Sequence, residues 1–286
     1  MTSKNRIISC SFTFLITTLI LLSFTLLGNA QTLYSCKKPD SVSPFLYTVN
    51  QSTGATLTTT KITLAGEIIN RCPGMAKDPT TGVCWMILNI TEPETTNPRV
   101  LVTVDEVTGV ATLIGDTGEA FSTIAFDADG TLYEVTGDGA SPPETLFTLS
   151  KANGLPAFVQ SLGNGQDGEA IAFNPRDGLL YHASGTGELN TAQIFETINL
   201  QNGIVTPIFL SGDPDSGETT ALVYSGNNRF FRVEGKALLL IMIFLNELPI
   251  QPDHILEILY SQYLNNCNMR GFEVYPRAPA RSLNIL

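Results

Sequence analysis

The chain has 286 residues, only 15% of them charged, and a formal net charge of −11. Soluble domains average about 25% charged residues, so this composition, which is rich in Thr and Gly, favours short strands and turns over helices with charged faces. The negative charge disfavours non-specific binding to nucleic acid or to anionic lipid, so neither is an expected partner.

The first thirty residues predict a signal peptide. Lys4 and Arg6 precede an apolar run over 7–27, and the small residues Gly28 and Ala30 close the segment. This order is typical of a signal peptide, cleaved here after Ala30. The run is long for such a core, so an uncleaved membrane anchor is the alternative, which the Thr and Ser residues inside the run disfavour. Cleavage makes the protein secreted, or periplasmic in a Gram-negative bacterium, with no membrane contact left.

Residues 31–235 contain about four imperfect repeats of roughly 45 to 50 residues. The clearest repeat, over 101–135, has four short apolar or β-branched runs separated by turn residues such as Thr108-Gly109 and Asp129-Gly130. Gly supplies the positive φ that tight hairpin turns need. The glycines of the corresponding turn in the four repeats are Gly54, Gly109, Gly154 and Gly203.

Each repeat predicts two hairpins, and four short strands in that length form one blade of a β-propeller. A blade cannot bury both faces alone, so neighbouring blades must stack. The predicted fold class is all-β and β-propeller-like, with about four four-stranded blades that need not close a full ring. A β-sandwich is the alternative, but β-sandwiches do not usually repeat one four-strand sequence pattern at a fixed period.

The repeats resemble those of bacterial secreted β-propeller proteins of the YVTN/NHL-like kind, which have a WD40-like architecture. Residues 101–135 match the pattern L-Y-x-V-D-x-x-T-G … I-G … L-A-F-D-x-D-G-x-L-Y closely, and 146–181 match it nearly as well. The first and fourth repeats are looser, and the resemblance covers about 46–233. Because such propellers include binding proteins, lyases and lactonases, the resemblance concerns architecture and implies no single activity.

Residues 236–286 depart from the repeats. They contain no Thr, and their apolar run over 237–245 is too short to span a bilayer. Residues 253–264 have the pattern of an amphipathic helix with Asp253 as N-cap, so a short helical tail is expected. Two explanations stay open: a helical cap over the edge of the last blade, or loss of the reading frame near residue 235 in a protein with further blades.

The cysteines predict a disulfide near the start of the mature chain. Signal cleavage removes Cys10 and leaves four cysteines, an even number that suits an oxidising compartment. We expect Cys36 to pair with Cys72 or Cys84, which ties the incoming chain to the first repeat; Cys267 is the fourth. Free, buried thiols are the alternative.

No catalytic constellation stands out in the sequence. His182, the only histidine of the repeats, is expected to end a strand with its ring partly packed. Carboxylates are better candidates, because each repeat carries a Gly-Glu pair shortly before the strand that contains Ala or Leu. If that strand is innermost, these acids border the central channel and could hold Ca²⁺; the alternative is a solvated acidic loop. The candidate binding residues are Glu119, Glu169 and Glu218, with Glu67 in the first repeat.

These features together predict an exported, non-enzymatic β-propeller module that binds a protein or a glycan through its loops. No catalytic residue is assigned, and Ca²⁺ is the only cofactor considered. The rival functions are a metal-dependent propeller hydrolase or lyase, and a truncated product without a function of its own.

Overall fold

The computed structural model describes most residues between 33 and 260. All regular secondary structure in the described part is β-strand, which confirms the all-β class there. It contains no helix long and apolar enough to span a bilayer. The predicted signal peptide over 1–30 lies outside the described residues. The described ranges are 33–37, 43–50, 55–91, 99–137, 140–162, 167–185, 194–208, 219–226, 229–234, 239–243 and 257–260.

Four antiparallel sheets follow one another along the chain, each containing four strands that are neighbours in sequence. A separate three-stranded sheet precedes them, and the short strand β4 (Thr63–Leu64) joins the first of the four in parallel with β8. The three-stranded sheet consists of β1 (Leu33–Lys37), β2 (Phe45–Val49) and β3 (Thr56–Lys61). The four-stranded sheets are β5 (Ile69–Lys77), β6 (Cys84–Ile90), β7 (Arg99–Val104) and β8 (Val110–Asp116); β9 (Phe121–Phe126), β10 (Leu132–Thr136), β11 (Thr145–Leu149) and β12 (Pro156–Ser161); β13 (Asp167–Asn174), β14 (Leu179–Gly185), β15 (Ile194–Ile198) and β16 (Val205–Pro207); β17 (Thr219–Tyr224), β18 (Arg229–Glu234), β19 (Leu239–Ile243) and β20 (Glu257–Tyr260).

Polar side chains and glycines form the hairpin turns that the sequence predicts. In the β9–β10 turn, Asp127 Oδ1 accepts hydrogen bonds from the backbone N–H groups of Asp129 (3.0 Å) and Thr131 (2.8 Å). Gly130 adopts a φ of 80°, a conformation that side chains disfavour. The Asp-x-Asp-Gly segment is therefore a tight turn whose first carboxylate is already occupied by backbone donors.

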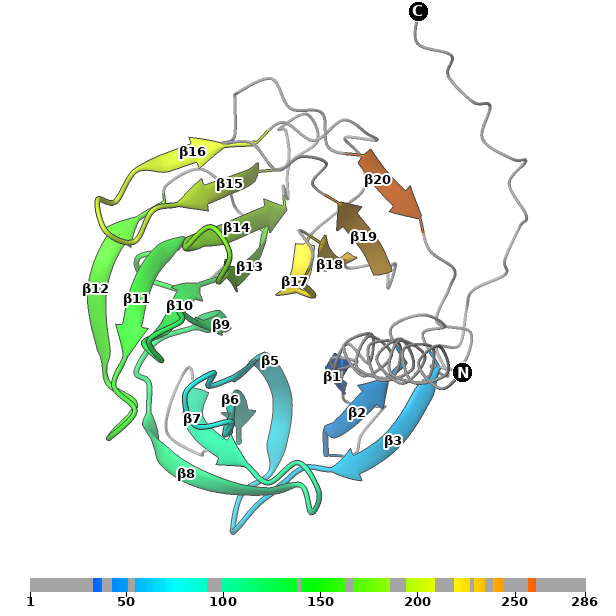
Figure 1. Cartoon of the computed structure of the whole chain (residues 1–286). Helices are drawn as coiled ribbons and strands as arrows, with labels where there is room; N and C mark the ends of the chain where they lie inside the picture. Colours follow the sequence, from blue (N-terminus) through cyan, green and yellow to red (C-terminus); the bar gives the residue numbers. More distant parts are fainter. Residues whose placement is uncertain are drawn as a thin grey trace, which may run out of the picture.

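The four sheets are arranged around a centre as the blades of a β-propeller (Figure 1). Strand β5 lies against β9, β9 against β13, and β13 against β17, so the first strand of each blade is innermost. Gly74 on β5 lies against Thr123 on β9, and Thr123 Oγ1 accepts a hydrogen bond from the N–H of Ile171 on β13 (3.0 Å). These are nearly equivalent positions of the repeat, so the inner strands run the same way and begin at one end of the ring.

Apolar side chains fill the spaces between successive blades, as the stacking of blades requires. Trp85, the only tryptophan, is part of this core. The three-stranded sheet packs on the other face of the first blade through Leu46, which joins a cluster with Met86 and Val102. The clusters between blades include Trp85 and Ile87 with Ile124 and Phe147, Val135 with Ile171 and Leu180, and Tyr181 with Leu222 and Phe230.

The sheets divide the repeats at a different point from the sequence prediction. The repeat over 101–135 begins with β7 and β8 of the first blade and ends with β9 and β10 of the second. A period has the same length from whichever strand it is counted, so it cannot show where a sheet begins. Each of the first three blades combines the second half of one repeat with the first half of the next, and the fourth combines the second half of the last repeat with two strands of the tail.

Two short segments of the tail are described, and both are strands, whereas the sequence predicts a helix over 253–264. Leu239–Ile243 is strand β19 and Glu257–Tyr260 is strand β20, and the two complete the fourth sheet beside β18. Periodicity alone cannot distinguish helix from strand in such short apolar runs, and pairing with β18 satisfies their backbone groups. The rest of 236–286, including Asp253, lies outside the described residues, so both explanations of the tail stay predictions.

Candidate functional site

One buried position recurs in the second strand of every blade, directly after an aromatic residue. We call it the second-strand position. Three of the four blades place an ionisable side chain there, and each residue lies opposite the same position of its inner strand. The four pairs are Met86 opposite Met75, Glu134 opposite Ile124, His182 opposite Ile171, and Arg232 opposite Leu222.

The second-strand position faces the preceding sheet. Side chains directly opposite each other on paired strands point to the same face of a sheet. Glu134 lies opposite Ile124 on β9 and Phe147 on β11, and both pack in one cluster with Trp85 of the first blade. The Glu134 carboxyl is therefore enclosed between the first and second blades.

Glu134 is completely buried, and neither oxygen of its carboxyl has a hydrogen-bond partner among the described residues. Burial raises the pKa of Glu134 well above its ordinary value of 4.5; Arg99 acts to lower this pKa, and the charge of Glu119 adds to the rise. Burial therefore favours the neutral form of the carboxyl, which donates one hydrogen bond and accepts others. A buried polar group without a partner costs stability and is unusual in a folded protein.

Glu119 lies at the end of the ring where the inner strands begin, in the loop between β8 and β9. Thr117 holds this loop on β7, because its backbone N–H and its Oγ1 both donate to the carbonyl of Arg99 (3.0 and 2.7 Å). The N–H of Gly137 donates to the carbonyl of Ala120 (3.0 Å), which holds the end of β10 beside the same loop. Glu119 and Arg99 are only partly buried. We call Arg99, Glu119 and Glu134 the Glu134 cluster.

The other two ionisable residues at the second-strand position have hydrogen-bond partners. His182 Nδ1 lies 3.0 Å from Glu196 Oε1, with both side chains buried, and Arg232 Nε donates to Thr219 Oγ1 (2.7 Å). His182 Nε2 has no partner within the described part of the chain. The expectation that His182 ends its strand is wrong, because β14 continues to Gly185.

Of the four carboxylates that the sequence singles out, the structure describes the side chains of two. Glu119 belongs to the Glu134 cluster, and Glu67 lies in the loop before β5, at the start of the first inner strand. Only the backbone of Glu169, in β13, is described, and Glu218 lies outside the described residues. Convergence of Glu119, Glu169 and Glu218 at the channel therefore stays a prediction.

The described residues include no group of three or more His, Cys, Asp or Glu side chains placed to hold a metal ion. Ca²⁺ binding stays a prediction. Cys36, Cys72 and Cys84 are thiols in the structure, and the predicted disulfide also stays a prediction.

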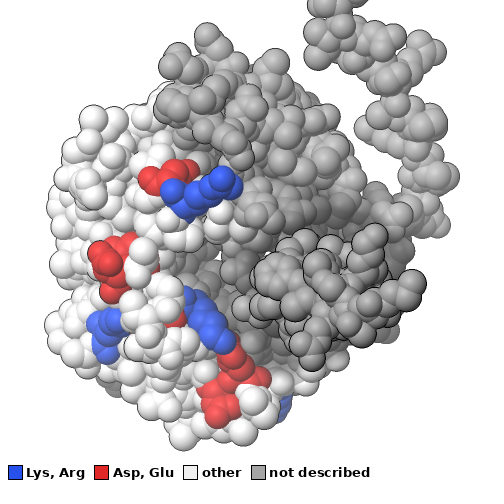
Figure 2. All heavy atoms as spheres, viewed as in Figure 1, with Lys and Arg blue, Asp and Glu red and all other residues white. Residues whose placement is uncertain are grey.

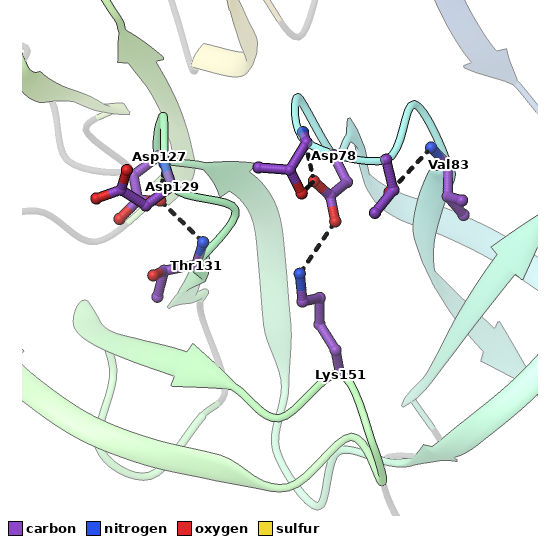
Figure 3. Close-up of polar contacts among 8 residues, drawn as sticks. Asp78, Val83, Asp127, Asp129, Thr131 and Lys151 are labelled. Carbon is purple, nitrogen blue, oxygen red and sulfur yellow. Dashed lines mark hydrogen bonds and ion pairs between the residues drawn. The ribbon is translucent and has the colours of Figure 1, made fainter.

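An ion pair between the buried Asp78 and the exposed Lys151 joins the first and second blades at the β5–β6 turn (Figure 3). Asp78 is 1% exposed; its Oδ2 lies 3.0 Å from Lys151 Nζ, and its Oδ1 accepts hydrogen bonds from the N–H (2.8 Å) and Oγ1 (2.6 Å) of Thr80. Burial alone would raise the pKa of Asp78, but the hydrogen bonds from Thr80 and Lys151 outweigh it and hold this pKa well below its ordinary value. Because both carboxylate oxygens of Asp78 have partners, we interpret the pair as a structural contact between the two blades.

Charged side chains are scattered in mixed clusters over the described part of the face drawn in Figure 2. Lys77 Nζ lies 3.0 Å from Glu106 Oε2, as Lys151 Nζ does from Asp78. Basic groups lie beside acids, so neither sign dominates the described part of this face.

Sequence reasoning missed Glu134 and Arg99, which complete the surroundings of Glu119. A signal for Glu134 exists in the sequence. When the repeats are aligned on the aromatic residue of the second strand, Glu134 falls at the same position as Met86, His182 and Arg232. No comparable signal marks Arg99, whose role follows from the pairing of β7 beside the Glu119 loop.

Comparison with known proteins supports the fold alone. No protein-family model matches the sequence, and no curated protein matches it. An auxiliary nutrient binding protein from Bacteroides ovatus is 13% identical, with 77% of this chain and 57% of that chain covered and a TM-score of 0.46. A gluconolactonase from Xanthomonas campestris is 17% identical, with 74% and 69% covered and a TM-score of 0.49. TolB from Acinetobacter baumannii is 13% identical, with 80% and 52% covered and a TM-score of 0.50.

These distant matches are to β-propeller proteins. The chain spans little more than half the length of two of them, the nutrient binding protein at 57% and TolB at 52%. At such low identity the likeness concerns architecture and carries no activity over.

Proposed function

We propose that this chain is an exported, non-enzymatic binding module that takes a polyhydroxylated ligand, such as a glycan, at the Glu134 cluster. The observation that carries the proposal is the burial of Glu134 without a hydrogen-bond partner among the described residues. Met86 occupies the same position in the first blade and is equally buried, so this fold accepts an apolar side chain there. A group that costs stability and that the fold does not need is best explained by a ligand.

The chemistry of the cluster suits hydroxyl groups, each of which both donates and accepts a hydrogen bond. The neutral Glu134 carboxyl is able to donate, the Glu119 carboxylate to accept, and the Arg99 guanidinium to donate. The positive charge of Arg99, which acts on Glu134, disfavours a free metal cation as the ligand.

Titration calorimetry of the full chain against a panel of mono- and oligosaccharides tests the proposal. We expect at least one saccharide to bind, and Glu119→Gln to weaken its binding by about tenfold, because a hydrogen bond to a charged group is lost. Glu67→Gln is the matched control, since Glu67 also follows a positive-φ glycine before an inner strand but belongs to the blade with Met86. Its affinity is expected to equal that of the wild type.

Three results would contradict the proposal. The first is a panel without a single binder, and the second is an equal loss of affinity in the two variants. The third is release of product from a bound saccharide, which would make the chain a hydrolase or lyase.

A further inference from the structure

Two thiols meet where the three-stranded sheet lies against the first blade. Cys36 is in β1, opposite Leu46 of β2, and Cys72 is in β5, at the bulge between Arg71 and Gly74. Strands β1 and β5 are in contact, and both thiols pack on the same apolar cluster. The Cys72 thiol donates to the Gly74 carbonyl (3.9 Å) and to Met86 Sδ (3.8 Å), so neither contact fixes it by a covalent bond. Two cysteines on contacting strands, with their side chains in one cluster, are placed as a disulfide requires.

We propose that Cys36 and Cys72 are oxidised to a disulfide that fastens the three-stranded sheet to the first blade. The structure thereby distinguishes between the two partners that the sequence allows for Cys36. Cys84 is only 4% exposed, in β6 opposite Lys77 and Val104, and the described residues show no hydrogen bond from it to another thiol. Burial raises the pKa of Cys84 to about 12, which keeps this thiol protonated and slow to react.

The bond would strengthen an attachment that is otherwise slight on the β1 side. The Tyr34 hydroxyl donates to Glu106 Oε2 (3.2 Å), and the two-residue strand β4 pairs with β8. The disulfide closes the chain between residues 36 and 72, a loop that contains β2, β3 and β4. Closing such a loop removes conformations from the unfolded chain, and the effect grows with loop length.

The oxidation is a thiol–disulfide exchange with a small-molecule or protein disulfide as oxidant. The Cys36 side chain and burial keep the pKa of Cys72 well above its ordinary value, so Cys72 is not the first thiol to attack and Cys36 takes that step. Its thiolate bonds to one sulfur of the oxidant and releases the other as a thiol. Cys72 then loses its proton to solvent, attacks the Cys36 sulfur and expels the second thiol. The protein loses two electrons and two protons, and the oxidant disulfide becomes two thiols.

Peptide mapping of the folded full-length chain tests the proposal directly. The chain is equilibrated with oxidised glutathione or with dithiothreitol, its free thiols are alkylated, and it is then digested with trypsin. Cleavage after Arg71 and Lys77 separates Cys72 from Cys84. We expect a cross-linked pair of peptides containing Cys36 and Cys72, together with alkylated Cys84, in the oxidised sample only. The chain oxidised in guanidinium is the control, and it should give a mixture of pairings.

The melting temperature supplies a second readout. Oxidation should raise it by roughly 5 to 15 °C in the wild type and in Cys84→Ala, and leave it unchanged in Cys36→Ser and Cys72→Ser. Each shift compares the oxidised and reduced forms of one variant, so a variant's own loss of stability cancels. Full alkylation of Cys36 and Cys72 after oxidation would overturn the proposal, as would a dominant link from either one to Cys84 or Cys267.

Discussion

Replacing Glu134 by Met places in the second blade the residue that the first blade carries at the second-strand position. Met86 is completely buried there, and Met is close to Glu in length, so E134M should fit without strain. The substitution removes a buried carboxyl that has no hydrogen-bond partner among the described residues. We therefore expect E134M to be more stable than the wild type.

Two contributions set the size of this gain. A buried polar group without a hydrogen bond costs about 1–3 kcal/mol, and this cost is present at every pH. The second contribution depends on pH, because the folded state keeps a proton on Glu134 that the unfolded state releases above the ordinary pKa of 4.5. Wild-type stability should then fall by about 1.4 kcal/mol for each pH unit between the unfolded and folded pKa values. E134M lacks this loss, so its advantage grows as the pH rises through that window.

Urea unfolding at a series of pH values from about 4 to 8 measures both contributions. Trp85 is the only tryptophan and packs in the same cluster as the neighbours of Glu134, so its fluorescence reports on this interface. E134Q keeps the shape of Glu134 and cannot ionise, which separates the pH-dependent contribution from the constant one. The reasoning is refuted if E134M is less stable than the wild type at pH 7, or if all three proteins show the same pH dependence.

Two further substitutions test the packing between blades. Asp78→Asn should destabilise the fold by about 2 kcal/mol at pH 7, because the buried Asp78 loses the charge that its hydrogen bonds and the partly solvated Lys151 stabilise. The contribution of Asp78 is present above its ordinary pKa of 3.8 and is lost on acidification, so urea midpoints that differ equally at pH 3 and pH 7 would contradict this account. Gly115→Ala should cost about 2 kcal/mol or more in thermal unfolding, because its Cβ would collide with the Asn153 carbonyl of the second blade. Gly178→Ala is the comparison, because the space there is open and only the positive φ of 73° opposes a side chain, and it should cost about 1 kcal/mol. If Gly115→Ala and Gly178→Ala lose the same stability, the backbone near Gly115 moves enough to relieve the collision with Asn153.

The strands and turns of this fold could be predicted from the sequence because they depend on local chemistry. The Asp127 side chain and Gly130 together specify their turn, and the alternating apolar residues specify the flanking strands. The innermost position of the strand that contains Ala or Leu was also expected, but from the resemblance to known propellers and not from the repeats themselves. The point at which each sheet begins was not predictable, since it depends on pairing between segments that a period cannot distinguish.

The site was only partly predictable. Glu119 stands out beside a glycine before an inner strand, but its neighbours Arg99 and Glu134 come from β7 and β10, in two different blades. Their approach depends on how the first and second blades stack, which no local pattern records. Glu134 also breaks the rule that strand residues facing a neighbouring blade are apolar, and such local violations are where function is expected.

Hydrogen exchange of the full chain, with and without the tightest-binding saccharide of the panel, tests the central claim most directly. Binding at the Glu134 cluster predicts slower exchange in peptides that cover 99–101, 117–122 and 132–137, with no change in the equivalent segments 64–70 and 84–90 of the first blade. Protection confined to other segments, or no saccharide that changes exchange anywhere, would contradict it.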